Sequence, residues 1–120
     1  MPTRSLAPRL MDMIEAIERI REVTASVTLD EFENDWAKRW LVERGVEIVS
    51  EASRHLPDDL KQRQPTIPWR KVAGIGNVLR HDYEHVAADI FWKLANEDLS
   101  PLEAVCRHEL ARARLDEPGS

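Results

Sequence analysis

The sequence predicts an all-α protein built as an up-and-down bundle of about five helices. Apolar residues recur at three- and four-residue steps over several long segments, which is the spacing of one face of an α-helix. No segment alternates apolar and polar residues as a half-buried strand does, and no Asn-Gly or Asp-Gly pair marks a hairpin. Helix start signals then divide the chain into separate helices.

The first helix is expected over residues 8–23, where apolar residues form an amphipathic stripe. The stripe consists of Leu10, Met13, Ile14, Ile17 and Ile20. Thr28 then stands at the position of an N-cap, and Glu31 follows three residues later to complete a capping box. Residues 29–32 are therefore expected to form a short helical turn.

The second long helix is expected over residues 35–54, and its apolar band is broad for a surface helix. The residues that can face a core are Trp36, Trp40, Val46, Val49 and Ala52, with Leu41, Val42 and Ile48 widening the band. A helix that is apolar on two sides in a small protein often contacts a partner chain. The sequence therefore predicts dimerisation through this helix.

A polar row on the same helix allows two interpretations. Arg44, Glu47 and Glu51 follow one another at i, i+3 and i+7, so they lie along one face. They form either a solvated stripe of ion pairs, worth a few tenths of a kcal/mol per pair, or a support for a functional site on a neighbouring helix.

Residues 55–65 are expected to form a connector, because Pro57 and Pro65 prevent a continuous helix. Pro68 is suited to the first position of a third helix. Gly74 and Gly76 each cost about 1 kcal/mol relative to Ala inside a helix. Their presence predicts the close approach of another backbone or of a ligand.

A fourth helix is expected over residues 86–96 and a fifth over residues 101–114. Ser100 and Glu103 have the spacing of a capping box, with Pro101 at the first helical position. Residues 115–120 are expected to fray.

Composition places the chain among ordinary globular proteins. Residues 1–120 are long enough for a single domain with one modest core. The sequence shows neither an apolar run that could span a membrane nor a secretion signal, and Cys106 is its single cysteine. Cytoplasmic localisation is the expectation.

Charge is distributed unevenly along the chain. The net charge of −5 argues against a general nucleic-acid coat protein. Residues 53–81 nevertheless hold six basic and two acidic residues, whereas residues 82–104 hold six acidic residues and Lys93. The basic charge ahead of His81 could receive a phosphodiester, or it could be a solvated face.

Residues 73–86 concentrate the groups suited to proton transfer and phosphate binding. Asn77, Arg80 and His81 stand at i, i+3 and i+4, so a helix would place all three on one face. Histidine suits proton transfer near neutral pH, and a guanidinium matches phosphate oxygens.

The run Ile-Pro-Trp-Arg-Lys-Val-Ala-Gly over residues 67–74 is followed by Asn77, Leu79, His81 and Tyr83. This pattern resembles the HepT-like branch of the HEPN superfamily, and the similarity extends from Leu10 to about Val105. The signature of that family is an Arg, four residues, a His, one residue and a Tyr. His81 and Tyr83 match it, but Gly76 stands where the Arg is expected.

The resemblance implies metal-independent RNA cleavage by a homodimer in which two copies of the site face each other. It also implies the toxin half of a toxin–antitoxin pair whose antitoxin is a small nucleotidyltransferase. His81 would be the acid and base, Asn77 would orient it or the phosphate, and Tyr83 would be the residue that the antitoxin adenylylates. Glu51 and Asp82 would support these groups, and no cofactor is implied.

Gly76 leaves the source of the cation open. Arg80 is the candidate within the catalytic cluster, and Arg70, Lys71 and Arg44 are the candidates for contacts with the rest of the substrate. A helical binding subunit that has lost catalysis and docks a nucleotidyltransferase or nucleic acid is the alternative. His81 would then be a histidine bonded to a carbonyl, and Tyr83 a surface tyrosine.

A metal site is not expected. Two histidines one helical turn apart, His81 and His85, suit Zn²⁺, but the sequence offers no clear third ligand for them.

Overall fold

The computed structural model describes residues 6–81, 93 and 97–116, and all regular structure within these ranges is helical. The helices are α1 (Leu6–Thr24), α2 (Leu29–Glu33), α3 (Trp36–Arg54), α4 (Asp58–Arg63), α5 (Trp69–His81) and α7 (Leu99–Asp116). The all-α prediction is confirmed.

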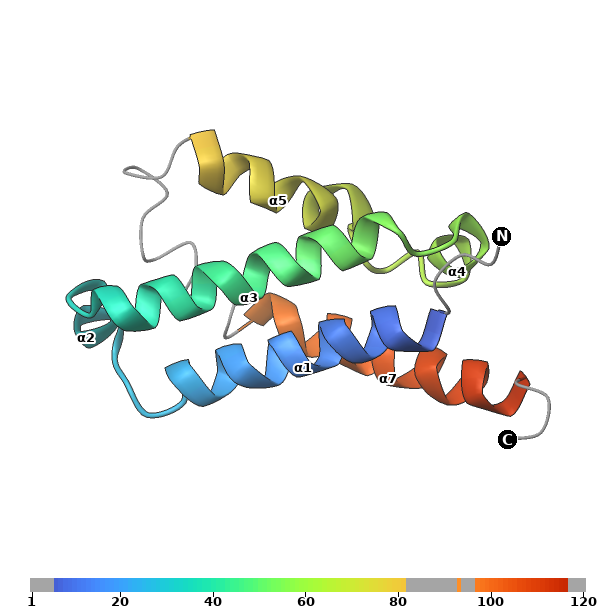
Figure 1. The fold of residues 1–120 in the computed structure, drawn as a ribbon, viewed down its shortest axis with the longest axis horizontal. Helices are drawn as coiled ribbons and strands as arrows, with labels where there is room; N and C mark the ends of the chain where they lie inside the picture. Colours follow the sequence, from blue (N-terminus) through green and yellow to red (C-terminus); the bar gives the residue numbers. More distant parts are fainter. Residues whose placement is uncertain (1–5, 82–92, 94–96, 117–120) are drawn as a thin grey trace.

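The four long helices run alternately in opposite directions, as an up-and-down bundle does (Figure 1). Helix α1 packs against α3 and α7, and α3 also packs against α5. Helix α5 therefore lies along α3, while α7 crosses behind α1 in this view (Figure 1). This order leaves one side of α3 facing the α1 core and another side carrying α5.

The core forms mainly between α1 and α3. The predicted stripe on α1 is confirmed, because Leu10, Met13, Ile14, Ile17 and Ile20 are all buried. Helix α3 contributes the buried residues Val42, Val46, Val49 and Ala52 to the same core. Burial of a Val, Leu or Ile side chain contributes about 1.5–3 kcal/mol, so this seam accounts for much of the stability of the bundle.

Gly45 is a point of close approach between these two helices. A Cβ atom built on Gly45 would lie 2.7 Å from Cγ1 and 2.9 Å from Cδ1 of Ile20. The sequence had instead predicted a close approach at Gly74. Among the described residues, and apart from the backbone of its own helix, a Cβ there would meet no atom within 4 Å, so no other backbone approaches Gly74 closely in that part of the structure.

The N-terminal half of α3 contradicts the prediction that its tryptophans face the core. Trp36, Trp40 and Leu41 are 66%, 60% and 59% exposed. An α-helix turns by about 100° per residue, so Trp36 lies about 120° around α3 from the buried Val42. The apolar band is wider than the face that the neighbouring helices cover.

The start of α2 follows its sequence signal. The hydroxyl of Thr28 accepts from the backbone N–H of Glu31 at 3.2 Å, and the Glu31 carboxylate accepts from the N–H of Thr28 at 3.1 Å. The predicted capping box is confirmed.

The predicted connector over residues 55–65 contains a helix, α4, which the sequence analysis missed. Pro57 caps this helix, and the fully buried Leu60 anchors it in the core. Pro68 also differs by one position from its prediction. Its carbonyl accepts from the N–H of Val72 at 3.1 Å and α5 begins at Trp69, so Pro68 is the cap rather than the first helical residue.

The capping box expected at Ser100 is wrong. Helix α7 begins at Leu99, so Ser100 lies inside it, and its hydroxyl accepts a hydrogen bond from Arg21 of α1 at 2.5 Å. The Glu103 carboxylate pairs with Arg21 and, at 2.9 Å, with Arg107. Contacts from Arg21 of α1 to Ser100 and Glu103 thus replace the expected local cap.

The C-terminal end of α7 extends farther than expected. The helix continues through residue 116, whereas fraying was expected from residue 115. Residues 117–120 and, apart from Lys93, the fourth helix predicted over 86–96 lie outside the described residues.

Glu109 joins α4 to α7. Its carboxylate is 1% exposed and accepts from Arg63 Nη2 at 2.8 Å and from Gln64 Nε2 at 2.9 Å. Burial alone would raise the pKa of Glu109, but the hydrogen bonds from Arg63 and Gln64 favour the charged form and hold the pKa below its ordinary value. Because the folded-state pKa is depressed, this stabilisation is present above the unfolded-state pKa and is lost as the pH falls through the folded-state pKa.

Within the described ranges, none of the helices is both long enough and apolar enough to cross a bilayer.

The two glycines give a matched test of the packing. Gly45→Ala is expected to lower the free energy of unfolding by about 1–2 kcal/mol, because overpacking against Ile20 outweighs the gain in helix propensity. Gly74→Ala is expected to leave stability unchanged or to raise it by up to about 1 kcal/mol, because its surroundings are open. Urea unfolding followed by circular dichroism measures both, and equal effects at the two positions would contradict the packing described for Gly45.

Candidate functional site

The candidate catalytic positions lie in the last two turns of α5. The helix is continuous through residue 81, so positions 77, 80 and 81 have the i, i+3, i+4 relationship that the sequence predicted. The side chains of Asn77, Arg80 and His81 lie outside the described part of the structure, as do Asp82 and Tyr83 altogether. Their proposed roles remain predictions.

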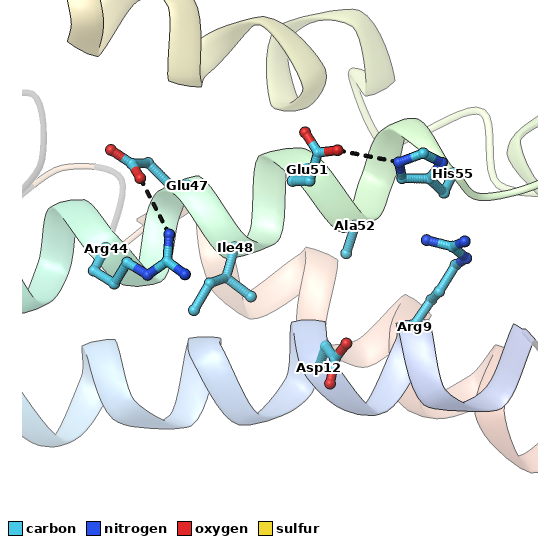
Figure 2. Close-up of a pocket in the computed structure, with 8 residues that line it drawn as sticks. All are labelled: Arg9, Asp12, Arg44, Glu47, Ile48, Glu51, Ala52 and His55. Carbon is cyan, nitrogen blue, oxygen red and sulfur yellow. Dashed lines mark hydrogen bonds and ion pairs between the residues drawn. The ribbon is translucent and has the colours of Figure 1, made fainter. Parts of the chain in front are cut away.

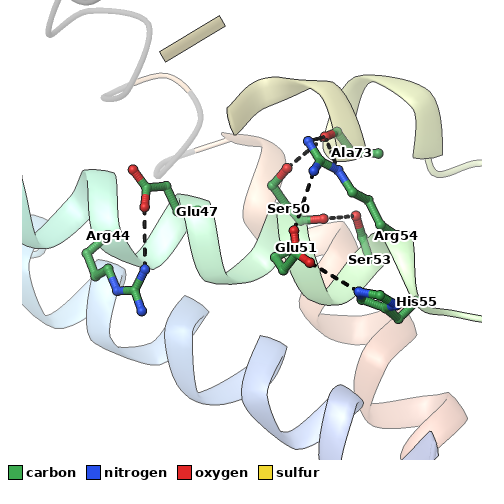
Figure 3. A network of polar contacts seen from close by, with 8 residues as sticks. All are labelled: Arg44, Glu47, Ser50, Glu51, Ser53, Arg54, His55 and Ala73. Atoms are coloured by element: carbon green, nitrogen blue, oxygen red, sulfur yellow. Dashed lines mark hydrogen bonds and ion pairs between the residues drawn. The ribbon is translucent and has the colours of Figure 1, made fainter. Parts of the chain in front are cut away.

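Helix α5 is fastened to α3 through a single backbone carbonyl. The oxygen of Ala73 accepts from Ser50 Oγ at 2.8 Å, from Arg54 Nε at 3.1 Å and from Arg54 Nη2 at 2.9 Å (Figure 3). Ser50 is buried, whereas Arg54 is partly open to solvent. These bonds fix the middle of α5 two turns before position 81.

Glu51 lies next to this junction. One carboxylate oxygen is 3.1 Å from Nε2 of His55, and the other accepts from Arg54 Nη1 at 3.4 Å. Glu51 was predicted to support the site, and the structure places it against Arg54 (Figure 3). His55 is exposed and contacts Glu51.

Arg44 is separate from that cluster. It pairs with Glu47 at 3.4 Å, nearer the N-terminal half of α3, and both side chains are largely exposed (Figure 3). The solvated stripe of ion pairs is thus the arrangement found for these two residues, and such a pair is worth little. Arg70 and Lys71 are exposed in the first turn of α5.

A groove of about 280 Å³ lies between α1 and α3 (Figure 2). Its lining consists of Arg9, Asp12, Arg44, Glu47, Ile48, Glu51, Ala52 and His55. Basic and acidic side chains alternate there, so the groove lacks the excess of positive charge that attracts a polyanion.

The comparisons with known proteins decide the family. Residues 13–109 match the sequence profile of the family described as "Ribonuclease HepT-like". The chain belongs to this family. It is 38% identical over 100 residues to "Probable ribonuclease HepT" of Thermococcus cleftensis, covering 83% of this chain and 91% of that protein.

A second HepT-like relative, a "Putative RNase" of Methanocaldococcus jannaschii, is 31% identical over 103 residues, or 86% of this chain and 94% of that protein. A "Putative RNase" of Caldanaerobacter subterraneus is 24% identical over 107 residues, or 89% of this chain and 96% of that protein. No solved structure matches the chain significantly.

The matched range of the HepT-like family includes both sides of the α3–α5 junction. Sequence reasoning found the α5 side of this junction and missed the other. In the sequence, Arg54 was only one of the six basic residues between positions 53 and 81, and Ser50 was not identified as a candidate. Their i, i+4 spacing on α3 was visible, but nothing local to α3 indicates that both would reach a carbonyl 19 or more residues away.

Cys106 is unsuited to act as the nucleophile of this HepT-like chain. Its side chain is fully buried, and burial, together with the negative charge of Glu103, raises the pKa of the thiol to about 12. Within the described residues, no group of three or more His, Cys, Asp or Glu side chains could hold a metal ion.

The buried thiol gives a direct check on the position of α7 in the core. At pH 8, Cys106 is expected to react with a thiol-specific reagent orders of magnitude more slowly in the native protein than in the denatured protein. The reason is that the native side chain is shielded from the reagent and little of it is in the reactive thiolate form. Absorbance after mixing with a disulfide reagent measures both rates. Equal rates in buffer and in denaturant would contradict the position of Cys106 in α7.

Proposed function

We propose that the chain is an endoribonuclease that cleaves RNA without a metal ion and serves as the toxin of a toxin–antitoxin pair. The observation that carries this proposal is the match to the HepT-like ribonuclease family over residues 13–109, which spans the helix with the His81 motif. The names of the relatives state an activity and no mechanism, so the reaction is argued from chemistry.

In this reaction the 2′-hydroxyl of the RNA attacks the adjacent phosphorus. The hydroxyl proton passes to a base, the P–O bond to the next nucleotide breaks, and an acid protonates the departing 5′-oxygen. His81 is assigned the proton transfers, because the ordinary pKa of histidine lies near neutral pH. Asn77 orients His81 or the phosphate, and Arg70 and Lys71 contact phosphates farther along the strand.

A homodimer is the second part of the proposal. Trp36 and Trp40 pack edge to face with ring centroids 5.1 Å apart, and with Leu41 they form an exposed apolar surface on α3. Trp36 and Arg54 are separated by five helical turns and so lie on the same side of α3. A second copy seated on the two tryptophans would therefore approach the side of α3 that carries α5.

The remaining assignments follow the same family. A nucleotidyltransferase antitoxin would adenylylate Tyr83 and add a negatively charged group beside His81, and Asp82 would support the histidine. Cytoplasmic localisation and a single domain over residues 1–120 belong to this proposal as well. The second candidate, a non-catalytic subunit that docks a nucleotidyltransferase or nucleic acid, is favoured by Gly76, which removes a cation from the motif.

The catalytic assignment is tested by RNA cleavage in EDTA. Purified protein is expected to cut tRNA or mRNA, and His81→Ala is expected to lose this activity by at least about 10²-fold, as the removal of a general acid or base does. Gel analysis of end-labelled RNA gives the rates. His108→Ala, a change at an exposed histidine on α7, serves as the control and should cleave normally. Equal inactivity of all three proteins would favour the binding subunit.

The dimer is tested by its mass in solution. The wild-type chain is expected to be a dimer by light scattering, and the double change Trp36→Ala with Trp40→Ala is expected to shift it to a monomer without loss of helix signal. Leu115→Ala removes a comparably exposed apolar side chain from α7 and should leave the dimer intact. A wild-type monomer, or a double variant that stays dimeric, would overturn the proposed interface.

A further inference from the structure

We propose that Arg54 of α3 supplies the guanidinium that contacts the scissile phosphate, in the place that Gly76 leaves without a cation. This inference rests on the proposed ribonuclease function and names a residue of the same site. Cleavage at phosphorus builds negative charge on the phosphate oxygens, and a positioned cation there accelerates such reactions strongly. The residue at position 76 has no side chain to provide it.

The hydrogen bonds of Arg54 place its charge directly on α5. Nε and Nη2 lie 3.1 Å and 2.9 Å from the oxygen of Ala73. In an α-helix the carbonyl oxygen of residue i points toward the N–H of residue i+4. The guanidinium therefore lies beside the turn that runs from residue 73 to residue 77.

That location is within reach of the position of the histidine. Positions 73, 77 and 81 follow one another four residues apart, so they lie along one side of α5. The rise from position 73 to position 81 is about 12 Å along the helix axis. The carbonyl oxygen of Ala73 points toward position 81, and a phosphate that accepts hydrogen bonds of about 2.8 Å on two opposite sides would occupy much of the remaining gap.

Arg54 also has hydrogen-bonding capacity to spare. A guanidinium carries five N–H donors, and three are engaged, two by Ala73 and one by Glu51. Among the residues that the structure describes, no partner takes the remaining two donors, so they can bind a ligand. The contact with Glu51 is long at 3.4 Å and solvent-exposed, so a phosphate can compete with it.

The other described cations are less well placed. Arg70 and Lys71 lie in the first turn of α5, farther from position 81 than Ala73 is. Arg44 is paired with Glu47 and lines the groove between α1 and α3 together with Arg9 and Asp12, so it faces α1 rather than α5. Arg80 directly precedes position 81, and successive helical residues point about 100° apart; it forms a separate arm of the test.

The test compares Arg54→Ala with Ser50→Ala. Both changes remove hydrogen bonds to the carbonyl of Ala73, but only the first removes a charge. Arg54→Ala is expected to cleave RNA about 10²–10³-fold more slowly, and millimolar guanidinium should restore part of the rate, whereas urea, which is uncharged, should not. Ser50→Ala should stay within a few-fold of wild type, and thermal unfolding confirms that each variant is folded. Arg80→Ala tests the competing cation, and a loss in Arg80→Ala with none in Arg54→Ala would assign the phosphate contact to Arg80 instead.

A binding measurement separates this inference from the ribonuclease proposal. Fluorescence anisotropy with an RNA oligonucleotide whose 2′-hydroxyls are replaced by hydrogen reports phosphate contacts without cleavage. Arg54→Ala is expected to weaken binding and to reduce the slope of log K against log salt by about 1, while Ser50→Ala keeps the slope. If the wild type binds this strand but cuts no RNA, the ribonuclease proposal fails and the slope still decides the role of Arg54.

Two results would overturn the role of Arg54. One is an unchanged cleavage rate and salt slope in Arg54→Ala. The other is an equal loss in Ser50→Ala with no rescue by guanidinium, which would make Arg54 only a tether between α3 and α5.

Discussion

The candidate site depends on the carbonyl of Ala73. Three hydrogen bonds from two side chains of α3 converge on that one oxygen and fix α5 in place. Because the acceptor is a backbone atom, the bonds specify the position of the helix rather than the identity of residue 73. One of the donors is a buried hydroxyl, and a buried polar group left without its partner costs about 1–3 kcal/mol. The hydrogen bonds from Ser50 and Arg54 thus fix the position of α5 along α3, because the buried hydroxyl of Ser50 would otherwise lose its partner.

The packing of the rest of the bundle fixes the position of α3. Its inner face packs on α1, with the backbones drawn together at Gly45 beneath Ile20. Helix α1 is in turn tied to α7 through ion pairs that include the largely buried carboxylate of Glu103. Ion pairs of exposed residues contribute little, but a carboxylate withdrawn from water needs its partners. A rigid α1–α3–α7 platform therefore carries α5.

Local sequence signals predicted most of the helices, whereas contacts between residues distant in the chain determined the features that the sequence did not predict. The α1 stripe and the capping box of Thr28 and Glu31 depend only on residues a few positions apart, so the sequence suffices for both. The same capping pattern at Ser100 failed, because a hydrogen bond from Arg21, far away in the chain, takes its hydroxyl. Helix α4 was missed because its prolines dominated the local pattern while its anchor, Leu60, is a single residue.

The site was predictable only on one of its two helices. The motif around position 81 could be read from residue types and spacing within α5, whereas Arg54 became a candidate only when α3 and α5 were packed together. The width of the apolar band on α3 correctly suggested more than one covered face, but the subunit alone leaves Trp36 and Trp40 exposed. Which face a helix buries depends on where its neighbours lie, and a single helix does not encode that.

Supplying the cation from α3 changes what the motif requires of α5. Residues five positions apart on a helix point about 140° away from each other, so an Arg at position 76 would have to reach around α5 to meet position 81. Residues eight positions apart diverge by about 80°, and Arg54 touches α5 at Ala73, eight residues before position 81. A guanidinium brought by the packing of two helices is then set by tertiary structure rather than by spacing within one helix. On this view Gly76 need not mark lost chemistry, because the charge that its position lacks is carried by the same helix that fastens α5 to the bundle.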